Sequence, residues 1–250
     1  MPGHAIKALL IDSGRVLNGP ASGHWFISPK FYTYVDRKTF QSISSSKRQN
    51  AFHHASQYIS QQPLIQNEEE EYTHFVHFYS LFSQSLPELD LDEMKVHALA
   101  EDLVYNRKKY AFFNDVLQCL PELSKSFKLA VVSDAWPSLE PVFVEAGMRD
   151  YFSSFIISSK VGVTKPNPLM YQSALEELGI KPEESLFIDD SLQNCEGAEQ
   201  LGIRSLRMLR DWRMYTYRKL FKKEVPVVRD FYGVMKRLNE IEKAERKKKL

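Results

Sequence analysis

Short apolar runs punctuate the chain, and each ends abruptly at a polar residue or a turn. Continuous runs of this kind are typical of strands that are buried on both faces of a parallel sheet. Between the later runs the apolar residues have helical spacing, which favours strand–helix alternation with right-handed crossovers. The runs predict strands at residues 5–11, 127–133, 155–157, 186–190 and 203–208. The expected fold class is therefore α/β, with a Rossmann-like parallel sheet as its core.

A block without strand patterns separates the first apolar run from the others. Its apolar residues recur at helical spacing, and Asn67 followed by Glu70 has the pattern of a helix cap with a capping box. Asp90 followed by Glu93 repeats that pattern. Amphipathic helices with no strand between them can bury a core of their own. The expected domains are an all-helical insertion, 18–109, and a core domain made of 1–17 and 110–250.

Composition restricts the partners of this chain. Hydrophobic residues make up 43% of its 250 positions, which is enough for a sizeable core. The net charge of +1 creates no general field for nucleic acid or for acidic partners. Cys119 and Cys195 suggest no disulfide framework. The first apolar run is too short for a membrane span, and it lacks the basic flank and the small-residue cleavage site of a signal peptide. We expect a cytoplasmic protein that binds neither nucleic acid nor membrane, and its oligomeric state stays open.

Polar side chains end three of the predicted strands, at the edge where open α/β sheets bind ligands. They are Asp12, Ser133 and the pair Asp189 and Asp190, and Lys165 stands at the start of a predicted helix. Several carboxylates stay ionised together only beside a cation, and an all-oxygen set favours Mg²⁺. The cation would draw in the anionic group of a substrate. Lys165 and Ser133 would hold its oxygens, and Asp12 would attack as a carboxylate nucleophile.

The order and spacing of these residues resemble the haloacid dehalogenase (HAD) superfamily. Asp12 resembles the family's nucleophile, Ser133 its hydroxyl motif and Lys165 its lysine motif. The acidic motif is similar to residues 187–194, which contain Asp189 and Asp190. The resemblance implies a subfamily I hydrolase with a Rossmann-like core and a helical C1 cap over the crevice. It also implies a Mg²⁺-dependent phosphatase that works through an aspartyl-phosphate intermediate.

One position departs from the family pattern. Gly14 stands where the family's phosphatases usually carry a second Asp, which protonates the leaving group and later activates water. The Asp-x-Gly form resembles a branch that includes bacterial glucose-1-phosphate phosphatases, which implies that activity survives the change. The resemblance further implies metal ligation by Asp12, the Gly14 carbonyl and Asp190. Asp189 either assists as a ligand or lies behind the ligands.

Four further residues are candidates for substrate binding. Arg15 replaces the family's usual glycine and either faces the pocket or is an exposed turn residue. Asp134 directly follows the candidate Ser133. His24 and Trp25 lie in the loop that leads into the helical block, where the resemblance places specificity.

Three functions stay open at the level of sequence. The favoured one is a Mg²⁺-dependent phosphatase for a small phosphorylated metabolite. The second is a catalytically weak or inactive binding protein on the same fold, because Gly14 removes the general acid. The third is a metal-independent, dehalogenase-like hydrolase that uses Asp12 on carbon. Magnesium dependence separates the first from the third, and turnover of an aryl phosphate separates the first from the second.

Overall fold

The computed structural model describes residues 5–221 and 225–248. The strands are β1 Ala8–Ile11, β2 Asn18–Pro20, β3 Tyr110–Phe112, β4 Lys128–Ser133, β5 Ser154–Ile157, β6 Ser185–Asp189, β7 Arg204–Met208 and β8 Val227–Val228. The α-helices are α1 Phe31–Tyr34, α2 Arg37–Ser42, α3 Ser45–Ser60, α4 Glu68–Ser85, α5 Glu93–Tyr105, α6 Asn114–Ser126, α7 Leu139–Glu145, α8 Ser158–Val161, α9 Pro168–Leu178, α10 Leu192–Gln200, α11 Trp212–Phe221 and α12 Phe231–Lys248. Short 3₁₀ turns are η1 Pro87–Leu89, η2 Arg107–Lys109, η3 Arg149–Tyr151 and η4 Pro182–Glu184.

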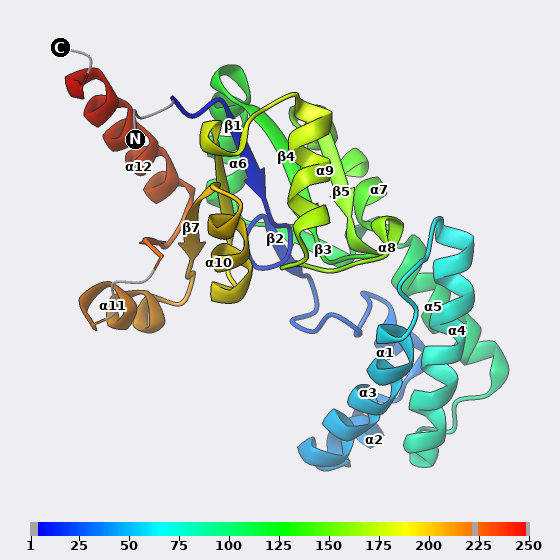
Figure 1. The fold of residues 1–250 in the computed structure, drawn as a ribbon. Coiled ribbons are helices and arrows are strands. Elements are labelled where there is room, and N and C mark those ends of the chain that lie inside the picture. The colour runs from blue at the N-terminus through cyan, green and yellow to red at the C-terminus, as the bar shows by residue number, and fades with distance from the viewer. Residues whose placement is uncertain (1–4, 222–224, 249–250) are drawn as a thin grey trace. The chain divides into compact units, whose positions relative to one another are not determined.

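A parallel sheet forms the centre of the α/β part of the chain (Figure 1). Its strand order is β5-β4-β1-β6-β7-β8, so β1 lies between β4 and β6. Ile11 is in register with Val131 of β4 and with Ile188 of β6. The residues that follow these three positions therefore emerge together at the carboxyl edge of the sheet. The predicted α/β fold class is confirmed, whereas β8 and the separate β2–β3 pair were not predicted.

Helices cover the sheet because its strands alternate apolar side chains between two faces. Leu10, Ala130 and Phe187 belong to one buried cluster with residues of α9 and α10, and Figure 1 shows these two helices along the sheet. The side chains of Leu9 and Ile11 point to the other face of the sheet and are also fully buried. The central strands are thus largely apolar because both faces of the sheet are covered there.

Contacts between Cα atoms divide the chain into two compact units. The first comprises the described residues up to Gly19, Phe112–Ala135 and those from Gly147 onward, and it contains the parallel sheet. The second comprises Pro20–Ala111 and Trp136–Ala146 and is almost entirely helical. Within the described residues, we find no helix that has both the length and the apolar character to cross a membrane.

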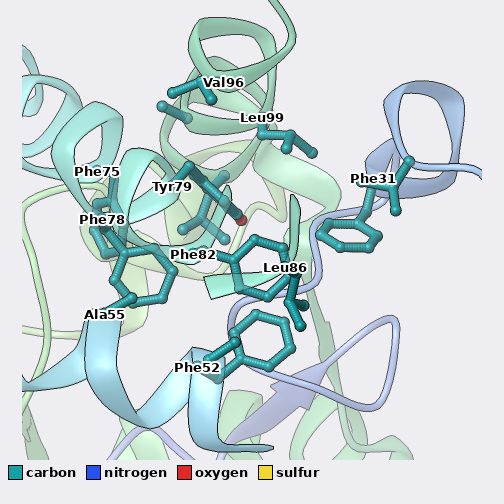
Figure 2. Close-up of a cluster of buried hydrophobic side chains, with 14 of the residues drawn as sticks. Phe31, Phe52, Ala55, Phe75, Phe78, Tyr79, Phe82, Leu86, Val96 and Leu99 are labelled. Carbon is teal, nitrogen blue, oxygen red and sulfur yellow. The ribbon is translucent and has the colours of Figure 1, made fainter. Parts of the chain in front are cut away.

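Aromatic side chains dominate the core of the helical unit (Figure 2). The ring centroids of Phe52 and Phe82 lie 4.6 Å apart, and Phe78 and Tyr79 are fully buried beside them. The hydroxyl of Tyr79 donates to the carbonyl of Phe26 at 2.9 Å, so its polar end is satisfied. This unit therefore has a core of its own, built from α3, α4 and α5 and the loop before them.

Helix caps in this unit agree with the sequence at one site and differ at another. The Asn67 side chain accepts from the backbone of Glu70, as the capping pattern predicts. The prediction that Asp90 caps the next helix is wrong. Asp90 has a left-handed backbone and ends η1, and Asp92 caps α5 by accepting from the backbone of Lys95. Both aspartates precede the same apolar pattern, so the sequence alone did not separate them.

The segment Trp136–Ala146 belongs to the helical unit, although the sequence places it in the core domain. The Trp136 ring packs on Phe75, with centroids 5.1 Å apart. The backbone N–H of Ser138 donates to Glu71 Oε2 at 2.7 Å, and Lys109 also donates to the Ser138 hydroxyl. Burial raises the pKa of Glu71 and lowers the pKa of Lys109 to about 8. A buried charge without a partner is costly, and Ser138 supplies hydrogen-bond partners to both Glu71 and Lys109. These contacts are the physical reason why the segment packs in the helical unit.

Candidate active site

Three carboxylates meet at the carboxyl edge of the sheet. Asp12 follows β1, Asp189 ends β6, and Asp190 comes next. One oxygen from each of these three side chains lies within 4.8 Å of the others. The sequence prediction that these residues converge therefore matches the geometry. Ser133 ends β4 at the same edge, where it is in register with Ile157 of β5 and is buried.

Lys165 occupies the centre of this cluster. Its Nζ donates to Asp12 Oδ1 at 2.6 Å, to Asp189 Oδ2 at 2.7 Å and to the carbonyl of Val132 at 2.9 Å. These three bonds use every donor of an ammonium group. The lysine backbone N–H in turn donates to Asp134 Oδ1 at 2.9 Å. The geometry thus makes Lys165 the group that orients Asp12 and Asp189, and it assigns Asp134 to holding the lysine loop.

Charge is unbalanced around the lysine. Burial raises the pKa of Asp12 to about 7, although Lys165 opposes that shift. Burial also raises the pKa of Asp190, and the neighbouring Asp189 raises it further. Desolvation alone would lower the pKa of Lys165, but Asp12 and Asp189 reverse this effect, so its pKa is raised overall. Because carboxylates outnumber buried cations here, the set of oxygen donors fits a hard divalent cation.

Asp189 and Asp190 differ in how many partners they have. Asp189 accepts from Lys165, from the backbone of Ser191 at 2.7 Å and from Asn194 Nδ2 at 3.1 Å. Within residues 5–221 and 225–248, the side chain of Asp190 accepts one hydrogen bond, from Arg15 Nη1 at 3.5 Å. Asp190 therefore keeps free lone pairs for a ligand, whereas Asp189 is saturated. Asn194 was not among the predicted site residues, although it stands in the acidic motif.

The turn after Asp12 has an unusual backbone. Arg15 has a φ of 60°, which lies in the left-handed region. Its N–H donates to the carbonyl of Asn18 at 2.7 Å, and the Asn18 side chain donates to Ser13 Oγ at 2.8 Å. Among the described residues, we find no hydrogen bond to the carbonyl of Gly14. The turn therefore leaves this oxygen without a hydrogen-bond partner among the described residues, two positions after Asp12.

The remaining two candidates lie in the helical unit. The ring of His24 packs on Phe52 at 4.4 Å, and burial lowers the pKa of His24. Trp25 packs against the ring of Tyr110 at 5.3 Å. Their assignment to substrate binding stays a prediction.

A glycine allows α10 to approach the lysine loop closely. A Cβ on Gly197 would lie 2.6 Å from Cβ of Pro166 and 3.3 Å from the hydroxyl of Tyr171. That hydroxyl donates to the carbonyl of Asn194 at 2.8 Å. The contact joins the helix that carries Asn194 to the loop that carries Lys165, so both sides of the cluster depend on it.

We expect Gly197→Ala to lower the free energy of unfolding by about 1–3 kcal/mol, because the added methyl overpacks this contact. Gly233→Ala is the matched control, since its Cβ would meet Val228 at an ordinary 3.4 Å. Gly233 lies in α12, where alanine is the better helix former, so this variant should be neutral or slightly stabilising. Urea denaturation of both variants measures the difference, and equal effects would contradict the close contact.

Comparisons with known proteins identify the family. A model of the family described as "Haloacid dehalogenase-like hydrolase" matches residues 42–208, more than half of the chain. The chain is 31% identical over 118 residues to glyceraldehyde 3-phosphate phosphatase of Methanopyrus kandleri, covering 43% of this chain and 49% of that protein. It is 32% identical over 123 residues to (S)-2-haloacid dehalogenase of Xanthobacter autotrophicus, covering 49% and 47%. The chain thus spans about half the length of the curated relatives it matches.

A solved structure with the same fold is a HAD-family enzyme of Bacteroides thetaiotaomicron, in complex with magnesium and inorganic phosphate. The TM-score is 0.57 at 20% identity, and the match covers 87% of this chain and 100% of that one. The similarity extends over both units of the chain. This similarity concerns the fold. The family match over residues 42–208 shows that this chain belongs to the haloacid dehalogenase-like hydrolases.

Proposed function

We propose that this chain is a Mg²⁺-dependent phosphatase that acts on a small phosphorylated metabolite through an aspartyl-phosphate intermediate. The observation that carries the proposal is the cluster of Asp12, Asp189 and Asp190, with the buried amine of Lys165 bonded to the first two. The phosphatase among the relatives and the magnesium and phosphate in the Bacteroides structure support it. The dehalogenase relative is the reason for testing magnesium dependence directly.

Asp12, Asp190 and the Gly14 carbonyl are the groups that would hold Mg²⁺. Asp190 and the Gly14 carbonyl have free lone pairs for this purpose, whereas the oxygens of Asp189 are taken by Lys165, Ser191 and Asn194. When bound, the cation supplies electrostatic stabilisation to the phosphoryl group. Asp189 and Lys165 hold each other in place, so we leave Asp189 out of the proposed metal ligands.

The chain's own residues account for the first half of the reaction. Lys165 holds one oxygen of Asp12, which fixes the carboxylate for attack at phosphorus. The new bond joins Asp12 to phosphorus, and the bond from phosphorus to the leaving oxygen breaks. The Ser133 hydroxyl would bind an oxygen of the phosphoryl group, and Arg15 would meet the substrate's anionic charge. Water then hydrolyses the aspartyl-phosphate and regenerates Asp12.

The experiment that tests the proposal is hydrolysis of an aryl phosphate and a panel of phosphorylated metabolites, with Mg²⁺ and with excess EDTA. We expect turnover that requires Mg²⁺ and returns when Mg²⁺ is added back. Full activity in EDTA on a 2-haloacid, with none on phosphates, would support the dehalogenase alternative. Absence of turnover on every substrate would favour the binding protein.

Gly14 leads to a second expectation about the same reaction. A general acid contributes about a hundred- to ten-thousandfold to a rate, and glycine at this position supplies none. The penalty should grow with the basicity of the leaving group, so anomeric, acyl and aryl phosphates should react faster than alkyl phosphates. Single-turnover rates over leaving groups of graded pKa measure this slope. Gly14→Asp should flatten it, and a flat slope in the unchanged chain would show that another residue donates the proton.

A further inference from the structure

We infer that Arg210 is a positioning residue, which holds the turn after Asp12 in the conformation that the site requires. The inference rests on the proposed function, because that turn carries the Gly14 carbonyl and Arg15. Arg210 follows β7 and is nearly two hundred residues away from the turn in the sequence. Nothing in the sequence motifs pointed to it.

Arg210 binds the turn through its backbone. Its Nη2 donates to the carbonyl of Val16 at 2.6 Å, and its Nε donates to the carbonyl of Arg15 at 3.2 Å. Both contacts are made to main-chain oxygens, so they fix the path of the chain and leave the side chains free. In the preceding peptide group, the N–H of Arg15 donates to the carbonyl of Asn18 at 2.7 Å. The left-handed residue is thus held from both directions.

The guanidinium itself is fixed by its surroundings. Asp115 accepts from Nη1 at 2.9 Å and from Nη2 at 3.2 Å, which is the bidentate geometry of strong arginine–carboxylate pairs. The ring of Phe113 lies under it, with 3.8 Å between the guanidinium carbon and the ring centroid. Asp115 also accepts from the backbone N–H of Phe231 at 2.8 Å. The arginine is therefore anchored to α6 and to the start of α12.

The turn needs such an anchor because of its backbone. A φ of 60° is unfavourable for every residue except glycine, and it persists where the surrounding structure enforces it. Here the enforcing contacts are those of Arg210 and Asn18. If Arg15 relaxed to a negative φ, the preceding peptide would turn, and with it the carbonyl of Gly14. Loss of Arg210 should therefore weaken metal binding, although Arg210 itself touches none of the proposed ligands.

Two substitutions of Arg210 test this role in the full chain, with Mg²⁺ affinity measured by calorimetry. Arg210→Lys keeps the charge for Asp115 but lacks the fork that reaches two carbonyls, so it should fold. We expect both Arg210→Lys and Arg210→Ala to weaken Mg²⁺ binding by about tenfold, because the ligands lose preorganisation. Arg204→Ala removes a comparable arginine–carboxylate pair, with Glu245, from the same strand region and should leave the affinity unchanged.

A rescue experiment separates positioning from general stability. In the Arg210→Ala background, Arg15→Gly should restore Mg²⁺ affinity, because glycine adopts the left-handed conformation without an anchor. Arg15→Ala should not restore it, although it removes the same side chain from Asp190. The difference between these two double variants isolates the backbone effect. Equal affinities in the two double variants, or wild-type affinity in Arg210→Ala, would overturn the inference.

Amide hydrogen exchange gives a readout that does not depend on the metal. The N–H of Arg15 and the N–H of Asn18 are both bonded within the turn, so their exchange should become faster in Arg210→Ala and not in Arg204→Ala. Unchanged exchange in Arg210→Ala would overturn the inference. A wild-type chain that binds no Mg²⁺ would overturn the proposed function, and the exchange rates would still decide the role of Arg210.

Discussion

Asp12→Asn should fold and lose at least about ten-thousandfold in phosphatase activity, because a covalent mechanism cannot proceed without its nucleophile. The amide keeps the shape of the carboxylate and an oxygen acceptor for Lys165, so its far-UV circular dichroism should match that of the wild type. A rapid acid quench should trap a phosphorylated chain in the wild type and none in the variant.

Asp150→Asn is the control for this change. Asp150 is an exposed carboxylate in the same unit, and its loss should leave both activity and phosphoenzyme unchanged. Activity of Asp12→Asn within about tenfold of the wild type would reject Asp12 as the nucleophile. It would also remove the main support for an aspartyl-phosphate.

Lys165→Met should produce the second large effect, this time on stability as well as activity. The lysine side chain is only 1% exposed and is paired with Asp12 and Asp189. Methionine fills a similar volume but leaves two buried carboxylates without a cation, so we expect a loss of about 3–5 kcal/mol in the free energy of unfolding. Urea denaturation measures this loss, and the activity of the folded fraction should also fall because Asp12 loses its orientation.

Lys7→Met is a control with a similar ion-pair distance. Lys7 Nζ lies 2.7 Å from Glu184 Oε1, but the lysine side chain is 58% exposed. Pairs of this kind are worth about 0–1 kcal/mol, so the control should unfold close to the wild type. A Lys165→Met chain as stable as the Lys7→Met chain would mean that Asp12 and Asp189 do not depend on the buried lysine.

The sequence by itself determined the strands β1, β4, β5, β6 and β7 of the parallel sheet and the kinds of residue at its carboxyl edge. Strands β1, β4 and β6 are buried on both faces, so their middle residues are apolar, and the polar residue that ends each run is easy to recognise. Asp12, Ser133 and Asp189 were found in this way, and parallel pairing predicts that they emerge at one edge. The cap of α4 at Asn67 was also predicted, because a cap is a contact within four residues.

Only the tertiary structure decided which groups these residues contact. Lys165 lies 153 positions from Asp12 in the sequence, and no local pattern shows that its amine divides three bonds among Asp12, Asp189 and Val132. The hydrogen bonds from Arg210 to the carbonyls of Arg15 and Val16 likewise join residues more than 150 positions apart. The place of Trp136–Ala146 in the helical unit depends on a buried contact between Glu71 and Ser138.

The physical reason for this difference is how far apart in the sequence the interacting residues lie. Periodicity and capping reflect contacts within one or two helical turns, so the identities of neighbouring residues are enough to predict them. Long side chains such as Lys165 and Arg210 find their partners only after the strands have paired and the helices have packed. The same polar residues would be compatible with exposed positions, so their partners follow from the fold and not from the motif.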